Sequence, residues 1–346
     1  MLGLFTCAKN EDKYISEWVY YHLKLGFDKI VIYDNSDDNS LMSTHLKNDT
    51  RIEIHHKPNE NNKFEHHLKI DEFIQNEKTI NRFKYIAVLD VDEFIVLKKH
   101  KSIKEFMNFI NLKEGCLGIN WMLFGSNNNK EYSESFVLNR FTRCNDKLNN
   151  HVKCISVLRD INNYTCCPHH PNLKRGCQIN ENGKELYKIQ NEIYKHNIIN
   201  KTSSFQLHST NDYIQINHYS VKSIDEFNNR FSNHHTRTDS KLFLEEHDTN
   251  KVIDKTALIF LLKDSEYNLF DYHFYITYYS DLLINGIINE EFAYSHFNNE
   301  GLKENRLSNL NYDYKTYKKN NNSLLSNEQI WKIVRQELLN SVYNIN

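Results

Sequence analysis

The first 110 residues alternate between short apolar runs and segments with helical periodicity, and this alternation restricts the fold more than any other feature of the chain. The strand-like runs are residues 2–7, 29–33, 51–55 and 85–89, and the helical segments are residues 14–25, 64–80 and, after Ser102, 103–110. Strands that alternate with helices predict an α/β fold, in which helices cover both faces of a mainly parallel sheet.

Three of the predicted strands end in a cluster of polar residues, at positions 9–12, 34–38 and 90–93. In sheets of this type, ligands bind beyond the carboxyl ends of the strands. We therefore expect the three clusters to converge on one crevice, although they lie far apart in the sequence.

Beyond Gly115 the pattern is less regular, with strand candidates at residues 116–124, 152–158 and 214–218. From Asp264 onward the composition shifts to Tyr-rich helical segments. Because domains commonly span about 100 to 200 residues, we divide the 346 residues into an α/β domain, residues 1–263, and a small helical C-terminal module, residues 264–346. The aromatic residues of this module suit packing or contacts in a homo-oligomer.

Charge and hydropathy exclude several kinds of partner. Lys and Arg number 43 against 45 Asp and Glu, so no general basic field would recruit nucleic acid. No apolar run approaches the roughly 20 residues that span a bilayer, and the first residues do not resemble a signal peptide. We expect a soluble protein located in the cytoplasm or elsewhere within the host cell.

Asp90 and Asp92 follow the most apolar of the predicted strands. Side chains alternate along an extended backbone, so both carboxylates would point to the same side and could face one cation. Oxygen ligands suit Mg²⁺ or Mn²⁺, which acts as a Lewis acid when a poor leaving group departs. Solvated turn carboxylates are the alternative, but three carboxylates beside a buried strand end are costly without cations or hydrogen-bond donors.

Four segments of the sequence, in this order, resemble the GT-A glycosyltransferases of family 92 and the related family 2-like group. They are FTCAKNEDKYISEWVYYHLKLGFDKIVIYDNSDDNS, YIAVLDVDEFIVL, NWMLFGSNNN and INHYSVKSIDEFNNRF, and they lie within roughly residues 1–235. The resemblance implies a Rossmann-like GT-A domain that depends on Mn²⁺ or Mg²⁺. It also implies a hexosyltransferase that moves a sugar, with inversion, from a nucleotide-diphosphate sugar, with UDP the expected nucleotide, to a glycan or other hydroxyl acceptor.

The same resemblance assigns roles to individual residues. Donor binding falls to Cys7, Ala8, Asn10, Glu11, Asp34, Asn35, Ser36 and Lys222, and metal binding to Asp90, Asp92 and His218. Three alternatives stay open: an Asx-rich turn at residues 34–38, a strand-end His218 bonded to backbone, and a surface Lys222.

On the acceptor side the resemblance points to Trp121, Gly125 and Ser126, where an aromatic face can stack on a sugar ring. Trp121 could equally belong to the core. An inverting reaction needs a general base, and the candidates are Asp160, Glu131 and His169. Asp160 is placed first because it follows a strand and precedes a loop. His169 matches a family histidine and Lys153 a family lysine, without an assigned role.

The sequence departs from the family pattern at residues 63–67, where the family often has Gln. Two other classes of protein remain as alternatives. A nucleotidyltransferase would favour a Gly-rich phosphate loop near the N-terminus, which this chain lacks. A non-catalytic sugar-binding relic would have no need of Asp90 and Asp92.

Overall fold

The computed structural model describes most of the first 262 residues and part of the remainder. The described residues are 1–38, 41, 45–58, 66–133, 136–164, 167–185, 202–206, 210–232, 240–262, 270, 275–276, 278–279, 281–282, 285, 287, 290–304, 306–308 and 326. The chain divides into two compact units, Met1–Ser133 with Arg140–Ala257 and Glu134–Asn139 with Leu258–Asn346. The boundary expected between residues 263 and 264 stays a prediction.

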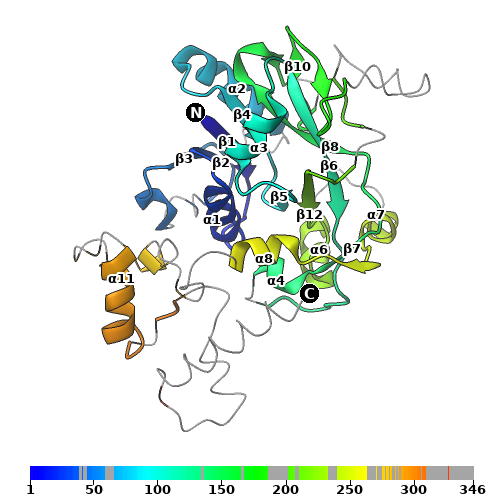
Figure 1. Ribbon diagram of the computed structural model, residues 1–346. Coiled ribbons are helices and arrows are strands. Elements are labelled where there is room, and N and C mark those ends of the chain that lie inside the picture. The colour runs from blue at the N-terminus through cyan, green and yellow to red at the C-terminus, as the bar shows by residue number, and fades with distance from the viewer. Residues whose placement is uncertain are drawn as a thin grey trace. The chain divides into compact units, whose positions relative to one another are not determined.

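The first unit is built on one large sheet (Figure 1). Its strands are β1 (Leu2–Ala8), β2 (Lys29–Asp34), β3 (Ile52–His56), β4 (Tyr85–Val88), β5 (Glu93–Leu97), β6 (Cys116–Leu123), β8 (Val152–Val157), β11 (Gln178–Ile179) and β12 (Ile214–His218). The order across the sheet is β3-β2-β1-β4-β8-β6-β12-β5, with β11 paired to β6. Two small antiparallel pairs join β9 (Ile161–Asn163) to β10 (Asn172–Leu173) and β7 (Arg143–Cys144) to β13 (Val252–Ile253).

The helices and helical turns complete the described elements. They are α1 (Ile15–Leu25), α2 (His66–Ile80), α3 (Ile103–Ile110), α4 (Val137–Arg140), α6 (Ile224–Ser232), α7 (Ser240–His247), α8 (Thr256–Leu262) and α11 (Glu290–His296), with turns η2 (His45–Asn48), η4 (Leu158–Asp160) and η6 (Phe297–Gly301). As the sequence predicts, α1 ends at Gly26, whose φ of 108° is left-handed, and Ser102 caps α3 by accepting the Glu105 amide.

Strand direction defines two edges of the sheet. The six strands β1 to β4, β6 and β12 run one way, as does the short β11 beside the start of β6, whereas β8 and β5 run the other way. We call the carboxyl edge the side where the six parallel strands end and where β5 and β8 begin, and the amino edge the opposite side. The predicted α/β fold with a mainly parallel sheet is confirmed.

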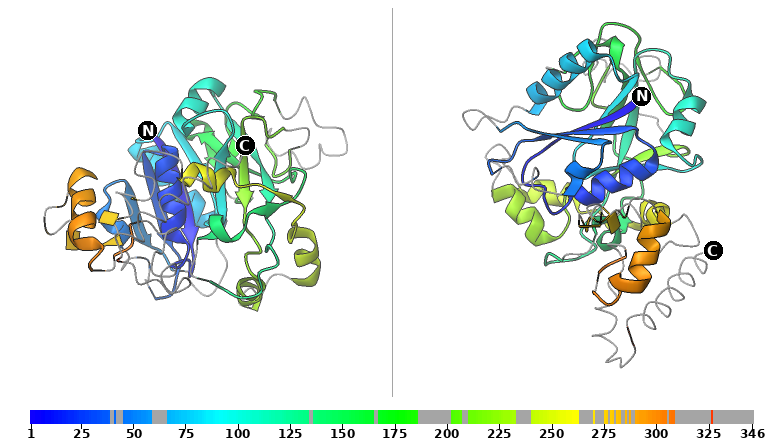
Figure 2. Two further views of the ribbon diagram at one scale, coloured as in Figure 1. Left: turned by 60° about the horizontal axis from the view of Figure 1, so that its bottom comes forward. Right: turned by 90° about the vertical axis from the view of Figure 1, so that its left-hand side faces the viewer.

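Two helices cover the first strands from opposite faces (Figure 2). The connections through α1 and α2 move in opposite directions along the sheet, and right-handed crossovers then place the helices on opposite faces. Phe73 of α2 stacks on Phe5 of β1, with ring centroids 4.2 Å apart. On the other face, α1 contacts both β2 and β5, which lie near opposite ends of the strand order, so the sheet curls around α1.

Within the described part of the first 110 residues, β5 is the strand of the large sheet that the sequence pattern does not predict. Residues 93–97 follow the polar cluster at 90–93 directly, and they pair with β12, which comes much later in the chain. Trp18 and Tyr21 of α1 donate hydrogen bonds of 2.8 Å to the carbonyls of Glu93 and Ile95. Long-range pairing, rather than local propensity, therefore creates this strand.

The described part of the second unit is held by aromatic packing around Tyr275 and Phe297, whose ring centroids lie 5.5 Å apart. A Cβ atom on Gly301 would overlap with the Tyr275 hydroxyl, so a larger residue would need Tyr275 to move. Tyr272, His273 and Asp264 lie outside the described residues, and a homo-oligomeric role for this unit stays a prediction. No helix in the described ranges combines the length and apolar character needed to cross a bilayer.

Candidate active site

The turn at residues 90–93 links β4 to β5 at the carboxyl edge. The Glu93 amide donates to the Asp90 carbonyl at 3.0 Å, and the Asp90 amide donates to Glu93 Oε2 at 2.8 Å. The expectation that Asp90 and Asp92 share an extended strand is wrong, because the chain has to reverse here to enter β5. The two carboxylates remain electrostatic neighbours, but each one faces a different cation.

Asp90 faces a buried lysine. The Lys153 ammonium lies 2.9 Å from Asp90 Oδ2 and 3.5 Å from Glu93 Oε2, and it has no exposed surface. Burial raises the pKa of Asp90, but Lys153 and then His66 outweigh it and hold the pKa well below its usual range. Burial dominates at Glu93 and raises its pKa. Lys153 therefore neutralises Asp90, whereas Glu93 favours the protonated form.

Asp92 faces an arginine and a histidine. Arg230 Nη1 donates to Asp92 Oδ2 at 2.5 Å, and His218 Nε2 lies 3.6 Å from Oδ1. Burial raises the pKa of Asp92, but Arg230 and His218 outweigh it and hold the pKa well below its usual range. Oδ1 is buried and has no hydrogen-bond partner among the described residues.

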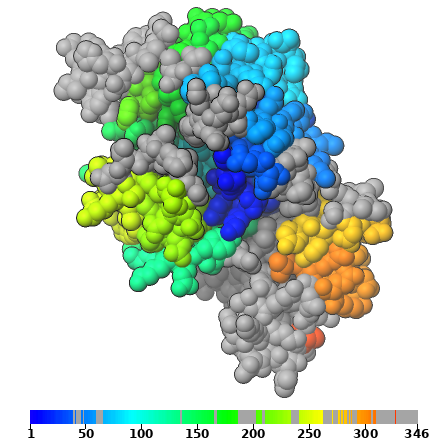
Figure 3. Space-filling model, turned by 180° about the vertical axis from the view of Figure 1, so that it is seen from behind, coloured from blue at the N-terminus to red at the C-terminus, as the bar shows by residue number. Residues whose placement is uncertain are grey.

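Glu11 and Lys222 approach the turn from the loops after β1 and β12. Burial, with a smaller contribution from Asp92 and Asp90, raises the pKa of Glu11 to about 7, although Lys222 and Arg230 oppose the shift. Lys222 has a left-handed φ of 57°, and its ammonium lies 4.5 Å from the centroid of the Tyr14 ring. Figure 3 shows from behind how the yellow-green segment with α6 lies beside the blue N-terminal segment.

The ends of β1 and β2 form a second polar group. Asn10 donates its amide to Ser36 Oγ at 2.9 Å, and Asn35 donates its amide to the Ala8 carbonyl at 2.7 Å. The Ser36 amide donates to Asp34 Oδ1, so the Asx-turn alternative describes the local geometry correctly. Asp34 Oδ2 and Asn35 Oδ1 are nevertheless buried without a hydrogen-bond partner in the described part of the chain.

Cys7 of β1 lies between these two groups. Burial raises the pKa of its thiol to about 12, and the charges of Asp90 and Asp34 add to this shift. The thiol is therefore neutral near pH 7, and Cys7 contributes a half-buried, uncharged surface between the two acidic groups.

Trp121 of β6 is enclosed by imidazole rings instead of presenting an open face. His151 stacks on its ring at 5.0 Å with an interplanar angle of 18°, and the His218 ring centroid is 4.2 Å away. The indole is 6% exposed, and its Nε1 has no hydrogen-bond partner among the described residues. This favours the core alternative over stacking of a sugar on the indole face.

Gly125 and Ser126 connect the loop after β6 to residues 248–250 by hydrogen bonds and close packing. Ser126 donates its amide and its hydroxyl to the two oxygens of Asp248, at 2.6 and 3.1 Å. A Cβ on Gly125 would lie 2.6 Å from Asn250 Oδ1. These contacts give both residues a structural role and leave the buried Ser126 hydroxyl engaged, so they do not support the predicted contact with an acceptor.

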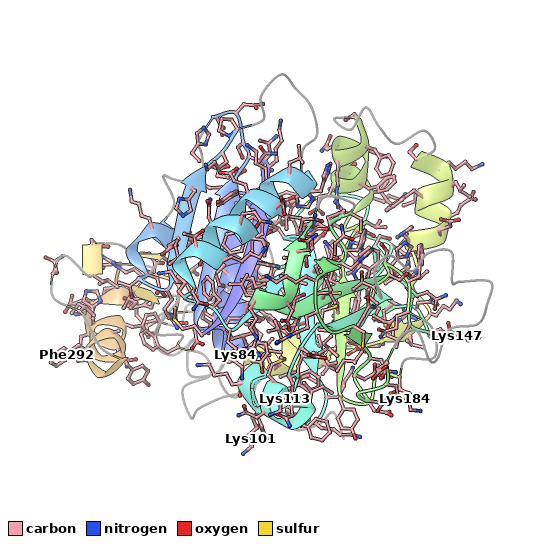
Figure 4. All side chains as sticks on the ribbon, turned by 90° about the horizontal axis from the view of Figure 1, so that it is seen from above. Lys84, Lys101, Lys113, Lys147, Lys184 and Phe292 are labelled. Carbon is pink, nitrogen blue, oxygen red and sulfur yellow. The ribbon has the colours of Figure 1, made fainter. Side chains whose placement is uncertain are left out.

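Asp160 lies at the amino edge, so the expectation that it belongs to the crevice is wrong. Because β8 runs antiparallel to β4, the end of β8 lies beside the start of β4 and β6. Asp160 accepts the Gly115 amide at 3.0 Å and pairs with Arg175. The exposed lysines Lys84, Lys101 and Lys113 lie along this same side of the sheet (Figure 4).

The other two base candidates differ in position. Glu131 is exposed in the loop after β6. His169 lies beside the site, with Nδ1 3.2 Å from the Val152 carbonyl. Burial and the neighbouring Lys153 lower the pKa of His169 to about 3, against a smaller opposing effect of Asp90. The structure thus brings His169, but not Asp160, towards the turn at residues 90–93.

Sequence reasoning missed part of this charged group. It gave no role to Arg230, although that residue lies within the segment INHYSVKSIDEFNNRF, and none to Lys153, although the resemblance pointed to that lysine. His66, in the segment that departs from the family pattern, lies 3.7 Å from Asp90 Oδ1. Antiparallel pairing of β8 beside β4 is the signal that would have placed Lys153 next to Asp90.

The site offers some of the ligands that a divalent cation needs. In the described part of the chain, no group of three or more His, Cys, Asp and Glu side chains is arranged to hold a metal ion. Asp92 and His218 do offer a carboxylate oxygen without a hydrogen-bond partner and a nearby imidazole, which are suitable ligands for Mn²⁺ or Mg²⁺. They fit a cation that takes its remaining ligands from a substrate, and ligation by Asp90, Asp92 and His218 stays a prediction.

Comparison with protein families identifies the chain. The model of glycosyltransferase family 92 matches residues 5–196, which is more than half of the 346 residues. The chain therefore belongs to glycosyltransferase family 92, and the resemblance seen in the sequence is confirmed. The match ends before β12 and α6, so His218, Lys222 and Arg230 lie beyond it. A comparison with curated proteins found no match.

Solved structures show a more distant similarity. S. aureus TarS shares 15% identity over 39% of this chain and 24% of its own, with a TM-score of 0.28. TarS 1–349 in complex with UDP-GlcNAc shares 14% identity over 45% of each chain, with a TM-score of 0.30. The complex of TarS 1–349 with UDP shares 14% identity over 45% of this chain and 46% of that one, with a TM-score of 0.31. This chain thus spans less than half the length of the TarS structures that it matches.

Proposed function

We propose that this chain transfers a sugar, as a hexosyltransferase, from a nucleotide-diphosphate sugar to a hydroxyl group of a glycan or other acceptor, with inversion. UDP is the proposed nucleotide, on the strength of membership in family 92. One observation carries the proposal: the buried Asp92 and the half-buried Asp90 lie among three cationic side chains, Lys153, Arg230 and Lys222, at the carboxyl edge of an α/β sheet. Such an arrangement suits a ligand that brings both a diphosphate and a counter-cation.

The cations support the departure of the leaving group. When the bond to the sugar breaks, negative charge develops on the terminal phosphate of the nucleoside diphosphate. Fixed donors aimed at developing charge are worth most in a site shielded from water. Arg230 and Lys222 both act electrostatically on Glu11 and Asp92, so a diphosphate bound near Asp92 would lie within their reach. They would stabilise the leaving group more strongly than the intact donor.

The aspartates and His218 would hold Mn²⁺ or Mg²⁺ together with the diphosphate. The cation would supply Lewis-acid neutralisation of the phosphate charge. Asp92 Oδ1, which is buried without a hydrogen-bond partner among the described residues, supports this role, because an unsatisfied buried carboxylate oxygen is costly unless a ligand compensates it.

The polar group at the ends of β1 and β2 would bind the nucleoside. Asp34 Oδ2 and Asn35 Oδ1 are acceptors that receive no hydrogen bond within the described ranges, although His56 Nδ1 lies 3.7 Å from Asp34 Oδ2. A uracil N–H and the ribose hydroxyls are donors that match them. Ala8, Asn10 and Ser36 would form the surrounding frame through the backbone contacts described above, and Cys7 would add its neutral thiol.

Binding and turnover of nucleotide sugars test the proposal. The full chain is mixed with UDP-glucose, UDP-galactose or UDP-N-acetylglucosamine, with and without Mn²⁺, and thermal stability and release of UDP are measured. Binding to the native state alone raises the melting temperature by mass action. We expect at least one donor to stabilise the parent and to release UDP, and Asp92→Ala to abolish release while staying folded. If Asp92→Ala still releases UDP at the parent rate in the presence of metal, Asp92 does not bind the metal and the diphosphate as proposed.

A further inference from the structure

His151 lies immediately before β8, and backbone hydrogen bonds fix it against Trp121. The Trp121 amide donates to the His151 carbonyl at 3.0 Å, and the Asn149 amide donates to the Trp121 carbonyl at 2.7 Å. His151 also forms an isolated β-bridge with Phe205. The backbone of residues 149–151 is therefore held on both sides, which fixes where the His151 side chain begins.

Asn149 fixes the tautomer of the His151 ring. The amide of His151 donates to Asn149 Oδ1 at 2.9 Å, and His151 Nδ1 lies 2.8 Å from the same atom. A backbone N–H can donate only to an acceptor, so this side-chain atom is the amide oxygen and Nδ1 has to carry the proton. In the neutral ring the lone pair then lies on Nε2, which is the form that can accept a proton.

The rings around His151 keep it neutral and leave part of it accessible. It stacks on Trp121, and the ring centroids of Phe205 and His169 lie 4.3 and 5.8 Å away. Burial, and then His218, lower its pKa. His151 is half-buried. Ring contacts link His151 through Trp121 to His218, whose Nε2 lies 3.6 Å from Asp92 Oδ1.

We propose that His151 is the general base that activates the acceptor, with Asn149 and Trp121 as its positioning residues; this inference rests on the proposed sugar transfer. His151 Nε2 takes the proton of the incoming hydroxyl group. The oxygen lone pair forms the bond to the anomeric carbon, while the bond from that carbon to the diphosphate oxygen breaks and leaves its electron pair on the nucleoside diphosphate. The imidazolium then returns its proton to solvent.

The other candidates fit this role less well. Asp160 lies at the amino edge, and Glu131 is exposed with no described contact to the site. His169 has the same anchored Nδ1, but the pKa of about 3 that burial and Lys153 impose makes it a weak base. His218 Nε2 lies 3.6 Å from Asp92 Oδ1, where it would ligate the cation of the proposed function instead of accepting a proton.

Water can replace the acceptor in a test, because the base would activate it in the same way. Release of UDP is measured without acceptor, using whichever of UDP-glucose, UDP-galactose and UDP-N-acetylglucosamine the parent hydrolyses fastest. We expect His151→Ala to lower kcat about 100-fold or more, with little change in UDP affinity. Added imidazole should restore part of the lost rate. Asn149→Ala should lower kcat by less, and Asn149→Asp, which keeps the acceptor oxygen, should rescue it.

His100, a half-buried histidine near the amino edge, provides the matched control, and His100→Ala should hydrolyse donor at the parent rate. The inference fails if His151→Ala also hydrolyses at the parent rate, or if imidazole restores His169→Ala and not His151→Ala. A parent that binds no UDP-sugar and releases no UDP would refute the proposed function itself, and the inference with it. Loss of UDP affinity in His151→Ala would reassign the residue to donor binding.

Discussion

Both edges of the sheet bury carboxylates, but the oxygens of these carboxylates are hydrogen-bonded to different extents at the two edges. At the amino edge, Arg82 binds both oxygens of Glu77, and Asp160 pairs with the Gly115 amide and Arg175. At the carboxyl edge, Asp34, Asp92 and Glu93 each keep one oxygen without a hydrogen-bond partner among the described residues. An edge whose charges are fully paired serves the fold, whereas spare acceptors beside a cation suit a ligand.

The largest expected difference between the edges is in catalysis. Asp92→Asn removes the charge that we assign to the metal and diphosphate, so UDP release should fall about 1000-fold. Asp160→Asn removes an equally buried charge from the other edge and should leave turnover unchanged, at a cost of about 1–2 kcal/mol in stability. Both variants are compared for turnover and by urea unfolding. If Asp92→Asn and Asp160→Asn lose turnover equally, the two edges do not differ in function as we propose.

Stability at the carboxyl edge should depend strongly on Lys153. Lys153→Met leaves the half-buried Asp90 carboxylate without its cation. Breaking a fully buried pair costs about 3–5 kcal/mol, which is an upper bound here because Asp90 is partly exposed. The double variant Lys153→Met with Asp90→Asn should recover part of this loss, since no charge is then left unpaired. The urea midpoint measures both. If the double variant is less stable than Lys153→Met alone, the unpaired charge of Asp90 is not what destabilises the single variant.

A smaller effect on the free energy of unfolding is expected from pH, and it should appear at the carboxyl edge. Glu11 has an ordinary pKa of 4.5 and a folded pKa of about 7, caused first by burial and then by Asp92 and Asp90. The folded state therefore holds a proton that the unfolded state has lost between these values, and stability falls as the pH rises through this window. The effect is on the order of 1 kcal/mol.

Urea unfolding at pH 5 and pH 8 tests this sign. Glu11→Gln carries no charge in either state, so its midpoint should fall less than that of the parent between the two pH values. A parent that becomes more stable relative to Glu11→Gln at pH 8 would contradict the assignment.

The smallest effect is expected for Arg175, which pairs with Asp160 but is half exposed. Arg175→Ala should cost less than about 1 kcal/mol, as solvent screens the pair, and should not alter UDP affinity. Arg230→Ala removes the matching partner of Asp92 and should weaken UDP binding. A calorimetric titration with UDP that finds equal affinity for both variants would remove Arg230 from the donor site.

The strand and helix pattern of the sheet could largely be predicted from the sequence, because periodicity and caps are local signals. Residues 214–218 were predicted with the observed bounds, and Gly26 and Ser102 marked the ends of their helices correctly. The strand β5 could not be predicted this way, since its partner β12 follows much later in the sequence.

The site was predictable only in part, for the same reason. The cluster at residues 90–93 could be recognised from its place after a buried strand. Which cation faces Asp90 and which faces Asp92 depends on β8 and α6, whose positions local patterns do not determine. Asp160 was misplaced because a carboxylate after a strand looks the same in sequence whichever way the strand runs.

The pairing of β5 with β12 also affects how the chain is made. Between synthesis of residue 97 and residue 218, β5 has no partner in the large sheet, an interval on the order of ten seconds at ribosomal speed. The turn with Asp90 and Asp92 thus leaves the ribosome long before β12, the strand that pairs with β5 just after this turn. A fragment that ends at residue 196, where the family match ends, would leave β5 unpaired and exposed to other chains. Expression of this protein should therefore include β12, however the domain limits are drawn.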